Sequence, residues 1–447
     1  MMAPAGRHEE GKKVKGKDGI LRVGALGCGR IFNGAHRFAY VRTLGTGHLV
    51  GLHDPDTARA QATGQRFREM LEEKLRDPAG TAGERAAAEA NLRELRVYPG
   101  SAALLEAVDV VDVYTTPQAR LACVVEAAQA GVHSMVEKPS ARTWLEAERM
   151  REAAERHGVL FQLNDDNLWD TRYTQVRRLL ERGLIGNVQT IWLSRGSQPN
   201  ATTVLKWQAT AEVAGGGAVM DYGSHGIATL WYLLGMEERV RPIRVESLEM
   251  AVRQRERTLE GEPFTLQVED DAHTKILWED TRTGAWITTF LESSWSGNEL
   301  GCVDHPYNQW IRVEGSRGIL TSFRDPSGEE FLRVQQWAHS AIPERAVGKE
   351  EVYAVQKDDR AKGNFDRGIA DFITRVSQGL PPLAGAPFAA DVIAVTGATY
   401  LSNLQGNRAV TLDEFRAHAL AVRDRYPNDR AAEEALIAEL MAPFRIK

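Results

Sequence analysis

The stretch HSMVEKPSART, residues 133–143, ends an apolar run on an acid, a lysine and a proline. Pro139 fixes the turn that directly follows Lys138, and a lysine at an ordinary surface position needs no such restraint. A lysine held in place can act in a site, and partial burial beside a cation lowers its pKa from the usual value of about 10.4. Most lysines are solvated surface residues, which is the alternative. The position after a strand and before a proline favours Lys138 as a residue of a reactive site.

A second group of reactive side chains follows in GGGAVMDYGSHG, residues 215–226. Asp221 and His225 are four residues apart, so they share one face of a helix. Gly223 between them leaves room for a ligand against the backbone. A histidine with a positioned carboxylate is the common arrangement for general acid–base catalysis. The alternative is a helix-terminal aspartate with a packed histidine, but dense glycines weaken a purely structural helix start.

A turn rich in small residues lies near the start of the chain, in RVGALGCGRIFNGAH, residues 22–36. Gly27, Cys28 and Gly29 follow a predicted strand and precede a predicted helix, so the backbone can approach a pyrophosphate there. The first N–H groups of the helix and its dipole favour such an anion. Phe32 stands where the dinucleotide-binding fingerprint has its third glycine. A glycine-rich turn is common by itself, but this context predicts a dinucleotide site.

An acid at the end of the next predicted strand strengthens this prediction. Asp54 lies 25 residues after Gly29, near the spacing of the carboxylate that binds the ribose of a dinucleotide. A carboxylate can accept hydrogen bonds from both ribose hydroxyls and repels a 2′-phosphate, so NAD is favoured over NADP. Arg59 is the nearby cation that would argue for NADP. The alternative role of Asp54 is to cap a turn ahead of Pro55.

Apolar strands alternate with helical stretches through the first part of the chain. This alternation predicts an α/β fold with a doubly wound parallel sheet covered by helices on both faces. Ligands of such sheets bind beyond the carboxyl ends of the strands, and Lys138 follows one of these ends. The charged segment 58–95 interrupts the rhythm and is predicted to form two solvent-facing helices. The predicted strands are 20–26, 48–54, 108–116, 132–137 and 159–164.

The second half of the sequence has a different pattern. Runs such as QTIWLS, AHTKILWE and GAWITTFLESSW are separated by glycine, aspartate and serine turns, which predicts a mostly antiparallel sheet. We expect a disordered tail at 1–18, an NAD(P)-binding Rossmann domain at 19–164 and a C-terminal α/β domain at 165–447. Helices are predicted at 171–182, 218–234, 365–378, 389–405 and 412–423.

Composition argues against several classes of protein. The 447 residues carry a formal net charge of −6, which provides no basic field for nucleic acid, and 43% are hydrophobic. The sequence has no apolar run long enough to span a bilayer, and its polar N-terminal segment lacks the apolar core of a signal peptide. Cys28, Cys123 and Cys302 show neither metal-ligand nor disulfide spacing, which favours a reducing compartment. We therefore expect a cytoplasmic protein.

Three features together resemble the Gfo/Idh/MocA oxidoreductase family: GCGRI with Asp54, the EKP tripeptide that contains Lys138, and GGG followed by DxGxH. The resemblance covers residues from about 20 to about 405. It implies a Rossmann domain followed by an α/β domain with an open, mostly antiparallel sheet. It also implies an NAD(P)-dependent dehydrogenase or reductase of sugars, sugar nucleotides or cyclitols. Family members often associate through the open sheet face, so we expect a homodimer or homotetramer.

The resemblance assigns catalysis to Lys138, Asp221 and His225. We expect His225 to take the hydroxyl proton, Lys138 to stabilise the developing alkoxide, and Asp221 to orient His225 or assist proton transfer. No metal is expected. The residues expected to bind the cofactor are Gly27, Cys28, Gly29, Arg30, Ile31, Asp54, Thr116, Pro117, Glu137 and Lys138. Those expected to bind the substrate are Asn164, Asp166, Trp169, Tyr173, Trp207, Asp221 and His225, with core packing as the alternative for the three aromatic residues.

Four departures from the family pattern accompany this resemblance. They are Phe32 in place of a small residue, Gln118 and Leu121 in place of asparagine and histidine, Leu168 after Asp165 and Asp166 in place of a frequent arginine, and Ala228 in place of a frequent aspartate. The last three are expected to alter substrate preference.

Two other functions use the same parts. An enzyme that keeps NAD bound can oxidise a sugar transiently, eliminate a glycosidic group and reduce the sugar again, which makes a glycosidase without net redox change. A regulator that binds a dinucleotide without chemistry would lack part of the catalytic set, whereas Lys138, Asp221 and His225 are all present.

Overall fold

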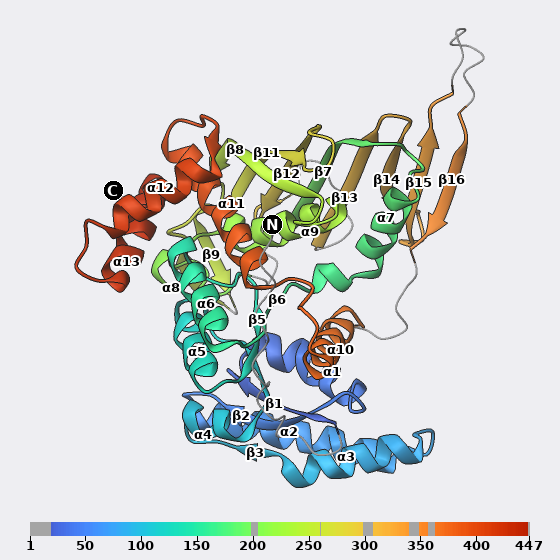
Figure 1. Ribbon diagram of the computed structural model, residues 1–447, viewed down its shortest axis with the longest axis vertical. Coiled ribbons are helices and arrows are strands. Elements are labelled where there is room, and N and C mark those ends of the chain that lie inside the picture. The colour runs from blue at the N-terminus through green and yellow to red at the C-terminus, as the bar shows by residue number, and fades with distance from the viewer. Residues whose placement is uncertain are drawn as a thin grey trace, which may run out of the picture.

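The computed structural model describes residues 19–197, 204–259, 261–297, 307–338, 348–355 and 363–445, so the predicted tail at 1–18 lies outside the described residues. The lower part of the molecule in Figure 1 is built on a six-stranded sheet in the order β3-β2-β1-β4-β5-β6, with every neighbouring pair parallel. This confirms the predicted doubly wound parallel sheet. The order reverses between β1 and β4, which places a ligand crevice beyond the carboxyl ends of these strands. The strands are β1 (Leu21–Leu26), β2 (Gly47–His53), β3 (Arg96–Val97), β4 (Val110–Val113), β5 (His133–Glu137) and β6 (Phe161–Asn164).

Helices connect the strands of this sheet and cover it. The predicted insertion forms two helices, α2 and α3; Asp56 caps the first, and a capping box between Thr81 and Glu84 starts the second. Phe67 and Leu71 of α2 are fully buried, so this insertion packs one face against the rest of the unit instead of being wholly solvent-facing. The helical segments are η1 (Phe32–His36), α1 (Arg37–Arg42), α2 (Thr57–Arg76), α3 (Ala82–Glu94), α4 (Ser101–Ala107), α5 (Pro117–Gln129) and α6 (Trp144–His157).

The upper part of the molecule is built on a nine-stranded sheet in the order β16-β15-β14-β13-β7-β12-β11-β8-β17. Only the β7–β12 pair of this described sheet is parallel, so the predicted mostly antiparallel sheet is confirmed. Its strands are β7 (Val188–Ser197), β8 (Val240–Ala251), β11 (Asp271–Asp280), β12 (Trp286–Ser294), β13 (Tyr307–Gly315), β14 (Gly318–Arg324), β15 (Glu330–Gln336), β16 (Glu350–Ala354) and β17 (Val410–Thr411). A separate hairpin comprises β9 (Glu256–Leu259) and β10 (Glu262–Thr265).

Aromatic side chains pack on both faces of the nine-stranded sheet. On the face covered by α9 (Ser224–Leu234) and α11 (Ala386–Leu404), the ring of Trp231 lies 5.6 Å from Trp278 and 5.0 Å from Phe388. Successive side chains of a strand point to opposite faces. On the other face Trp192 and Phe290 stack at 5.6 Å and remain partly exposed.

The C-terminal helices contact both sheets or the helices that cover them. Asp366 of α10 (Gly363–Gln378) accepts hydrogen bonds of 2.5 and 2.7 Å from Arg42 of α1. Helix α11 lies against both β8 and α6. The remaining elements are η2 (Asp166–Trp169), α7 (Thr171–Glu181), α8 (Ala211–Ala214), η3 (Val219–Gly223), α12 (Leu412–Arg423), α13 (Asp429–Leu440) and η5 (Ala442–Phe444). Helix α13 was not predicted. Within the described part of the chain, no helix has both the length and the apolar character needed to cross a membrane.

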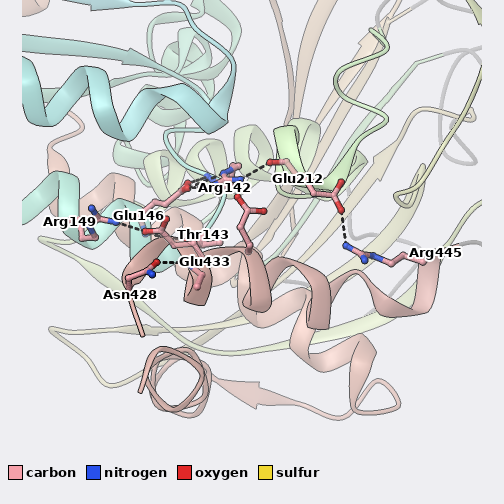
Figure 2. A network of polar contacts seen from close by, with 10 residues as sticks. Arg142, Thr143, Glu146, Arg149, Glu212, Asn428, Glu433 and Arg445 are labelled. Carbon is pink, nitrogen blue, oxygen red and sulfur yellow. Dashed lines mark hydrogen bonds and ion pairs between the residues drawn. The ribbon is translucent and has the colours of Figure 1, made fainter. Parts of the chain in front are cut away.

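A polar network joins α13 to α6 and α8 (Figure 2). Arg142 donates hydrogen bonds to Glu146 at 2.5 Å and to the carbonyl oxygen of Glu212 at 2.6 Å. Arg149 of α6 continues the network to Glu433 of α13 at 2.6 Å. The side chains of Arg142 and Glu146 are almost completely buried. The network thereby fixes α8, which leads directly into the run of three glycines.

Candidate active site

A cavity of about 1170 Å³ lies where the crevice of the first sheet meets the second half of the molecule. The Rossmann side of its wall includes Gly29, Asp54 and Lys138, and the opposite side includes Asp221 and Trp295. Of the predicted cofactor-binding residues, all except Cys28 line this cavity: Gly27, Gly29, Arg30, Ile31, Asp54, Thr116, Pro117, Glu137 and Lys138.

The loop after β1 has the geometry that close approach of a dinucleotide needs. Gly27 has a φ of +96°, and an added Cβ would come within 3.0 Å of the Tyr114 backbone. An added Cβ at Gly29 would have no neighbour within 4 Å, so the chain is open to a ligand there. Phe32 is fully buried with its ring 5.0 Å from that of Tyr114, so this departure from the fingerprint fills the core and leaves the loop free. These features fit a pyrophosphate at the start of the helix.

Asp54 is held by donors on three sides. Its Oδ2 accepts a hydrogen bond from the backbone N–H of Cys28 at 2.8 Å, and its Oδ1 accepts one from the N–H of Asp56 at 2.9 Å. The guanidinium of Arg59 also donates to Oδ1, at 3.0 Å. Burial, and then the charge of Asp54, raises the pKa of the Cys28 thiol to about 12, so this cysteine contributes its backbone and not a thiolate.

Lys138 and Asp221 meet across the cavity. The Lys138–Pro139 peptide bond is cis, and Lys138 Nζ lies 2.6 Å from Asp221 Oδ1. Asp221 Oδ2 accepts hydrogen bonds from Trp295 Nε1 at 3.1 Å and from Gln208 Nε2 at 3.3 Å. The two charged side chains are 19% and 16% exposed, so both can reach a ligand in the cavity.

A buried arginine fixes the backbone on both sides of Lys138. Arg120 donates from Nη1 to the carbonyl oxygens of Glu137, at 2.6 Å, and Pro139, and from Nε to that of Thr115 at 3.1 Å. Burial lowers the pKa of Arg120 to about 10, which leaves the guanidinium charged at neutral pH. Arg120 was not predicted, because its partners are backbone carbonyl groups, two of them 17 and 19 residues away.

His225 has a different carboxylate partner from the one expected. Its Nδ1 lies 2.7 Å from Asp165 Oδ1, and its Nε2 lies 3.9 Å from Asp166 Oδ1. The expectation that Asp221 orients His225 is wrong in this structure, because the Asp221 carboxylate is bonded to Lys138, Trp295 and Gln208.

The predicted substrate residues divide into two groups. Asp166, Trp207 and Asp221 line the cavity. Tyr173 and Trp169 are buried in the core, where Trp169 packs against Gly368, so the alternative of core packing holds for both. An aromatic residue shows the same sequence pattern whether it packs in the core or faces a ligand. Asn164 and His225 are buried and are not among the residues that line the cavity. Lining residues that were not predicted include Gln208, Tyr222, Trp295 and Phe365.

A buried carboxylate holds the glycine run that precedes Asp221. Glu269 accepts hydrogen bonds from the N–H groups of Gly217 at 3.1 Å and Val219 at 3.0 Å, and from the Tyr400 hydroxyl at 2.7 Å. Burial raises the pKa of Glu269 to about 7, although these hydrogen bonds act to lower it. An added Cβ at Gly217 would lie 1.8 Å from the carbonyl oxygen of Glu269, and one at Gly216 would lie 2.1 Å from the Tyr400 hydroxyl. The glycines therefore permit close packing that places Asp221.

A polar cluster lies beneath the cofactor side of the cavity. His36 Nε2 is 2.8 Å from Glu137 Oε1, and His36 Nδ1 is 2.8 Å from the Tyr114 hydroxyl. Burial alone would lower the pKa of His36, but hydrogen bonds to Asp112 and Glu137 outweigh it and raise the pKa to about 9. The cluster thus places a buried positive charge next to the residue that precedes Lys138.

Asp165, Asp166 and His225 each offer one atom that could hold a metal ion, and these atoms lie within 4.8 Å of one another. Lys138 and Arg195 already supply positive charge that acts on the carboxyl groups of both aspartates. Asp165 is also committed to the imidazole through a 2.7 Å contact. The absence of a metal requirement therefore stays a prediction.

A Rossmann sheet with a dinucleotide-type glycine loop at its switch-point cavity defines the class of dinucleotide-binding proteins. The family model for the NAD-binding Rossmann fold of the Gfo/Idh/MocA oxidoreductases matches residues 21–165, and the model for their C-terminal alpha/beta domain matches residues 177–412. The chain therefore belongs to the Gfo/Idh/MocA oxidoreductase family, as the resemblance predicted.

Individual relatives agree with this assignment. The chain is 28% identical over 400 residues to D-apiose dehydrogenase of Paraburkholderia graminis, covering 89% of this chain and 91% of that protein. It is 32% identical over 264 residues to dTDP-3,4-didehydro-2,6-dideoxy-alpha-D-glucose 3-reductase of Streptomyces violaceoruber, covering 58% of this chain and 68% of that protein. A solved levoglucosan dehydrogenase in complex with NADH and levoglucosan shares the fold, with a TM-score of 0.67 and 16% identity over 88% of this chain and 99% of that one.

Proposed function

We propose that this protein is an NAD-dependent oxidoreductase that interconverts a secondary alcohol and a ketone on a sugar, a sugar derivative or a cyclitol. The observation that carries the proposal is the 2.6 Å contact between Lys138 and Asp221 in a cavity that the dinucleotide loop also lines. The nicotinamide of the bound cofactor supplies the chemistry of accepting or returning a hydride.

The side chains in and beside the cavity can divide the remaining work. In this proposal Lys138 donates a hydrogen bond to the substrate oxygen and stabilises the negative charge that develops on it. Asp221 keeps the ammonium in position, because its second oxygen is itself held by Trp295 and Gln208. We assign proton transfer to Nε2 of His225, the nitrogen on the side of the cavity-wall residue Asp166.

The choice of NAD over NADP rests on Asp54. Its carboxylate lines the cavity and can accept ribose hydroxyl groups, whereas a 2′-phosphate there would meet like charge. Arg59, which pairs with Asp54 at 3.0 Å, neutralises part of that charge without replacing the acceptor oxygens.

A carbohydrate substrate is supported by the relatives and by the wall of the cavity. The relatives include a D-apiose dehydrogenase, a dTDP-3,4-didehydro-2,6-dideoxy-alpha-D-glucose 3-reductase and a levoglucosan dehydrogenase. In this chain Trp207 and Trp295 offer apolar ring surface beside the hydrogen-bonding groups of Gln208 and Asp166, a combination that suits a polyhydroxylated ring.

We also propose a cytoplasmic homodimer or homotetramer. Cys28 and Cys123 are free thiols, which fits a reducing compartment. The partly exposed stack of Trp192 and Phe290 gives the uncovered face of the nine-stranded sheet apolar surface for a second copy.

The test is a screen of NAD⁺ reduction by absorbance across sugars, inositols and nucleotide sugars, followed by Lys138→Met on the best substrate. Lys74→Met is the matched control, since this lysine pairs with Glu84 on the outer helices. We expect kcat/KM of Lys138→Met to fall at least about 100-fold, because the variant loses a hydrogen-bond donor to the substrate oxygen. The control should keep the parent value. Equal activity in the two variants would refute the assignment of Lys138.

The same screen separates the two other functions. Turnover of a glycoside without added NAD, with cofactor that copurifies with the protein, would identify a glycosidase that recycles its cofactor. Tight NADH binding without turnover of any substrate would identify a regulator.

A further inference from the structure

We propose that Arg195 binds an oxyanion of the substrate, so that the sugar on which this protein acts carries a carboxylate or a phosphate group. This inference rests on the proposed function and narrows its substrate class to acidic sugars. Arg195 was not predicted as a site residue, because β7 carries no motif that marks it.

The fold buries the Arg195 guanidinium without giving two of its nitrogens a partner. The residue lies near the end of β7 and is 7% exposed. Its Nε and Nη1 are buried, and neither has a hydrogen-bond partner in the described part of the chain. By contrast, the buried guanidinium groups of Arg120 and Arg142 donate to carbonyl and carboxylate oxygens. Burial of a guanidinium without acceptors is costly, so a ligand that supplies acceptor oxygens would bind there favourably.

Arg195 lies on the face of the nine-stranded sheet that bounds the site. It is directly opposite Ser293 in the parallel β7–β12 pair, so the two side chains point to the same face. Ser293 faces η3, because a Cβ added at Gly223 would lie 3.3 Å from its Oγ. The Arg195 guanidinium lies over the ring of Tyr222, 5.6 Å from its centroid, and Tyr222 lines the cavity. These contacts place the guanidinium beside a residue of the cavity wall.

Ser197 supplies a second unpaired donor on the same face. It lies two residues after Arg195 on β7, so the two side chains point the same way. Ser197 is 2% exposed, and its buried Oγ has no hydrogen-bond partner among the residues that the structure describes. A guanidinium and a hydroxyl together provide the donors that the oxygens of a carboxylate or a phosphate accept from.

The other charged groups of the site contact partners of their own. Lys138 pairs with Asp221 at 2.6 Å. Asp165 contacts an imidazole nitrogen at 2.7 Å, and Asp166 accepts a hydrogen bond of 2.5 Å from a side-chain amide. The charge of Arg195 acts on both of these carboxyl groups, but its Nε and Nη1 bond to neither of them. Arg195 is therefore the cation of this site that keeps donors for an anion from outside the protein.

The test compares acidic sugars with their neutral counterparts. The panel sets D-glucose against D-glucuronate, D-gluconate and D-glucose 6-phosphate, and D-galactose against D-galacturonate. We expect kcat/KM with NAD⁺ for at least one acid to exceed that of its neutral counterpart about 100-fold, because it gains hydrogen bonds to a charged group. Preference for a sugar carboxylate would identify a sugar acid as the substrate, and preference for the 6-phosphate would identify a phosphorylated sugar.

Arg195→Met should abolish this preference, and Arg195→Lys should keep part of it. The expected loss is about 100-fold in kcat/KM for the preferred acid, with the value for the neutral sugar changed less than about threefold. Arg241→Met is the matched control, since this exposed arginine of β8 pairs with Glu279 at 2.6 Å. A guanidinium that only balances buried carboxyl groups would affect acidic and neutral sugars equally, and that result would overturn the proposal. So would a parent protein that prefers none of the acids.

A readout without turnover separates this proposal from the proposed function. Trp207 and Trp295 line the cavity, so tryptophan fluorescence of the NADH-loaded protein can follow titration with the same sugars. The preferred acid should bind the parent and Arg241→Met at least about 30-fold more tightly than Arg195→Met, and equal affinities would overturn the proposal. Binding of an acid that is never oxidised would contradict only the proposed function. Oxidation of neutral sugars with no preference for acids would contradict only the role of Arg195.

Discussion

Asp54 performs two tasks that substitution can separate. It fixes the glycine loop through the N–H of Cys28 at 2.8 Å, and we propose that it also binds the ribose of NAD. Asp54→Ser removes the negative charge and one of the two carboxylates that pair with Arg59, whose guanidinium lies 3.0 Å from Asp54 and is about half exposed. A 2′-phosphate then meets a cation where it formerly met an anion.

The size of the effect follows from these contacts. A hydrogen bond to a charged group contributes about 1.5–3 kcal/mol, so losing one ribose contact weakens NAD binding by a factor of about 10 to 150. Removal of like charge, and of one of the two carboxylates that pair with Arg59, strengthens the binding of NADP. We therefore expect the preference for NAD over NADP, as a ratio of kcat/KM values, to fall about 100-fold.

The assay is a pair of steady-state titrations with NAD⁺ and NADP⁺, supported by fluorescence titration with NADH and NADPH. Asp56→Ser is the control: Asp56 also pairs with Arg59, at 3.1 Å, but it caps α2, and serine is an equally good cap. The control should keep the parent preference. An unchanged preference in Asp54→Ser, or an equal change in Asp56→Ser, would refute the role given to Asp54.

Three further variants test other parts of the structure. Arg142→Met leaves the buried Glu146 carboxylate without its partner, so the free energy of unfolding in urea should fall by about 3 kcal/mol. The double variant Arg142→Met/Glu146→Leu should recover part of this loss, and no recovery would contradict a buried ion pair. The pKa of His36 rises from 6.5 to about 9 on folding, so its stabilisation of about 3 kcal/mol should be complete below pH 6.5 and lost as the pH rises to 9. His36→Gln should remove this pH dependence, and an identical pH slope in both proteins would count against it. Gly217→Ala places a Cβ 1.8 Å from a carbonyl oxygen and should lower kcat/KM at least about 10-fold. The control is Gly45→Ala, whose Cβ meets no atom within 4 Å and which should keep the parent kcat/KM. Equal activities of the two variants would contradict the packing role of Gly217.

Local sequence signals predicted the features that depend on neighbouring residues. Strand–helix alternation predicted the parallel sheet, and the turn after β1, Asp54 and Lys138 were placed at one crevice because parallel strands end at a common edge. The switch from apolar runs to β-branched runs separated by turns predicted the second sheet.

Features that depend on distant contacts could not be predicted in the same way. The pairing of Asp165 with His225 spans 60 residues, and Asp221 pairs instead with Lys138, 83 residues away. Glu269 reaches the glycine run from a loop about fifty residues further on and has no motif of its own. Whether an aromatic side chain such as Tyr173 faces a sugar or the core depends on tertiary packing that periodicity does not encode.

The central claim is that Lys138 and His225 act on the same substrate oxygen, and a double-mutant cycle tests it most directly. The measurement compares kcat/KM of Lys138→Met, His225→Asn and the double variant on the best substrate. If both groups serve one transition state, the double variant should lose little more activity than the worse single variant, because residues that act as a unit are not additive. Losses that multiply across the cycle would show that the two side chains act independently and would contradict the account.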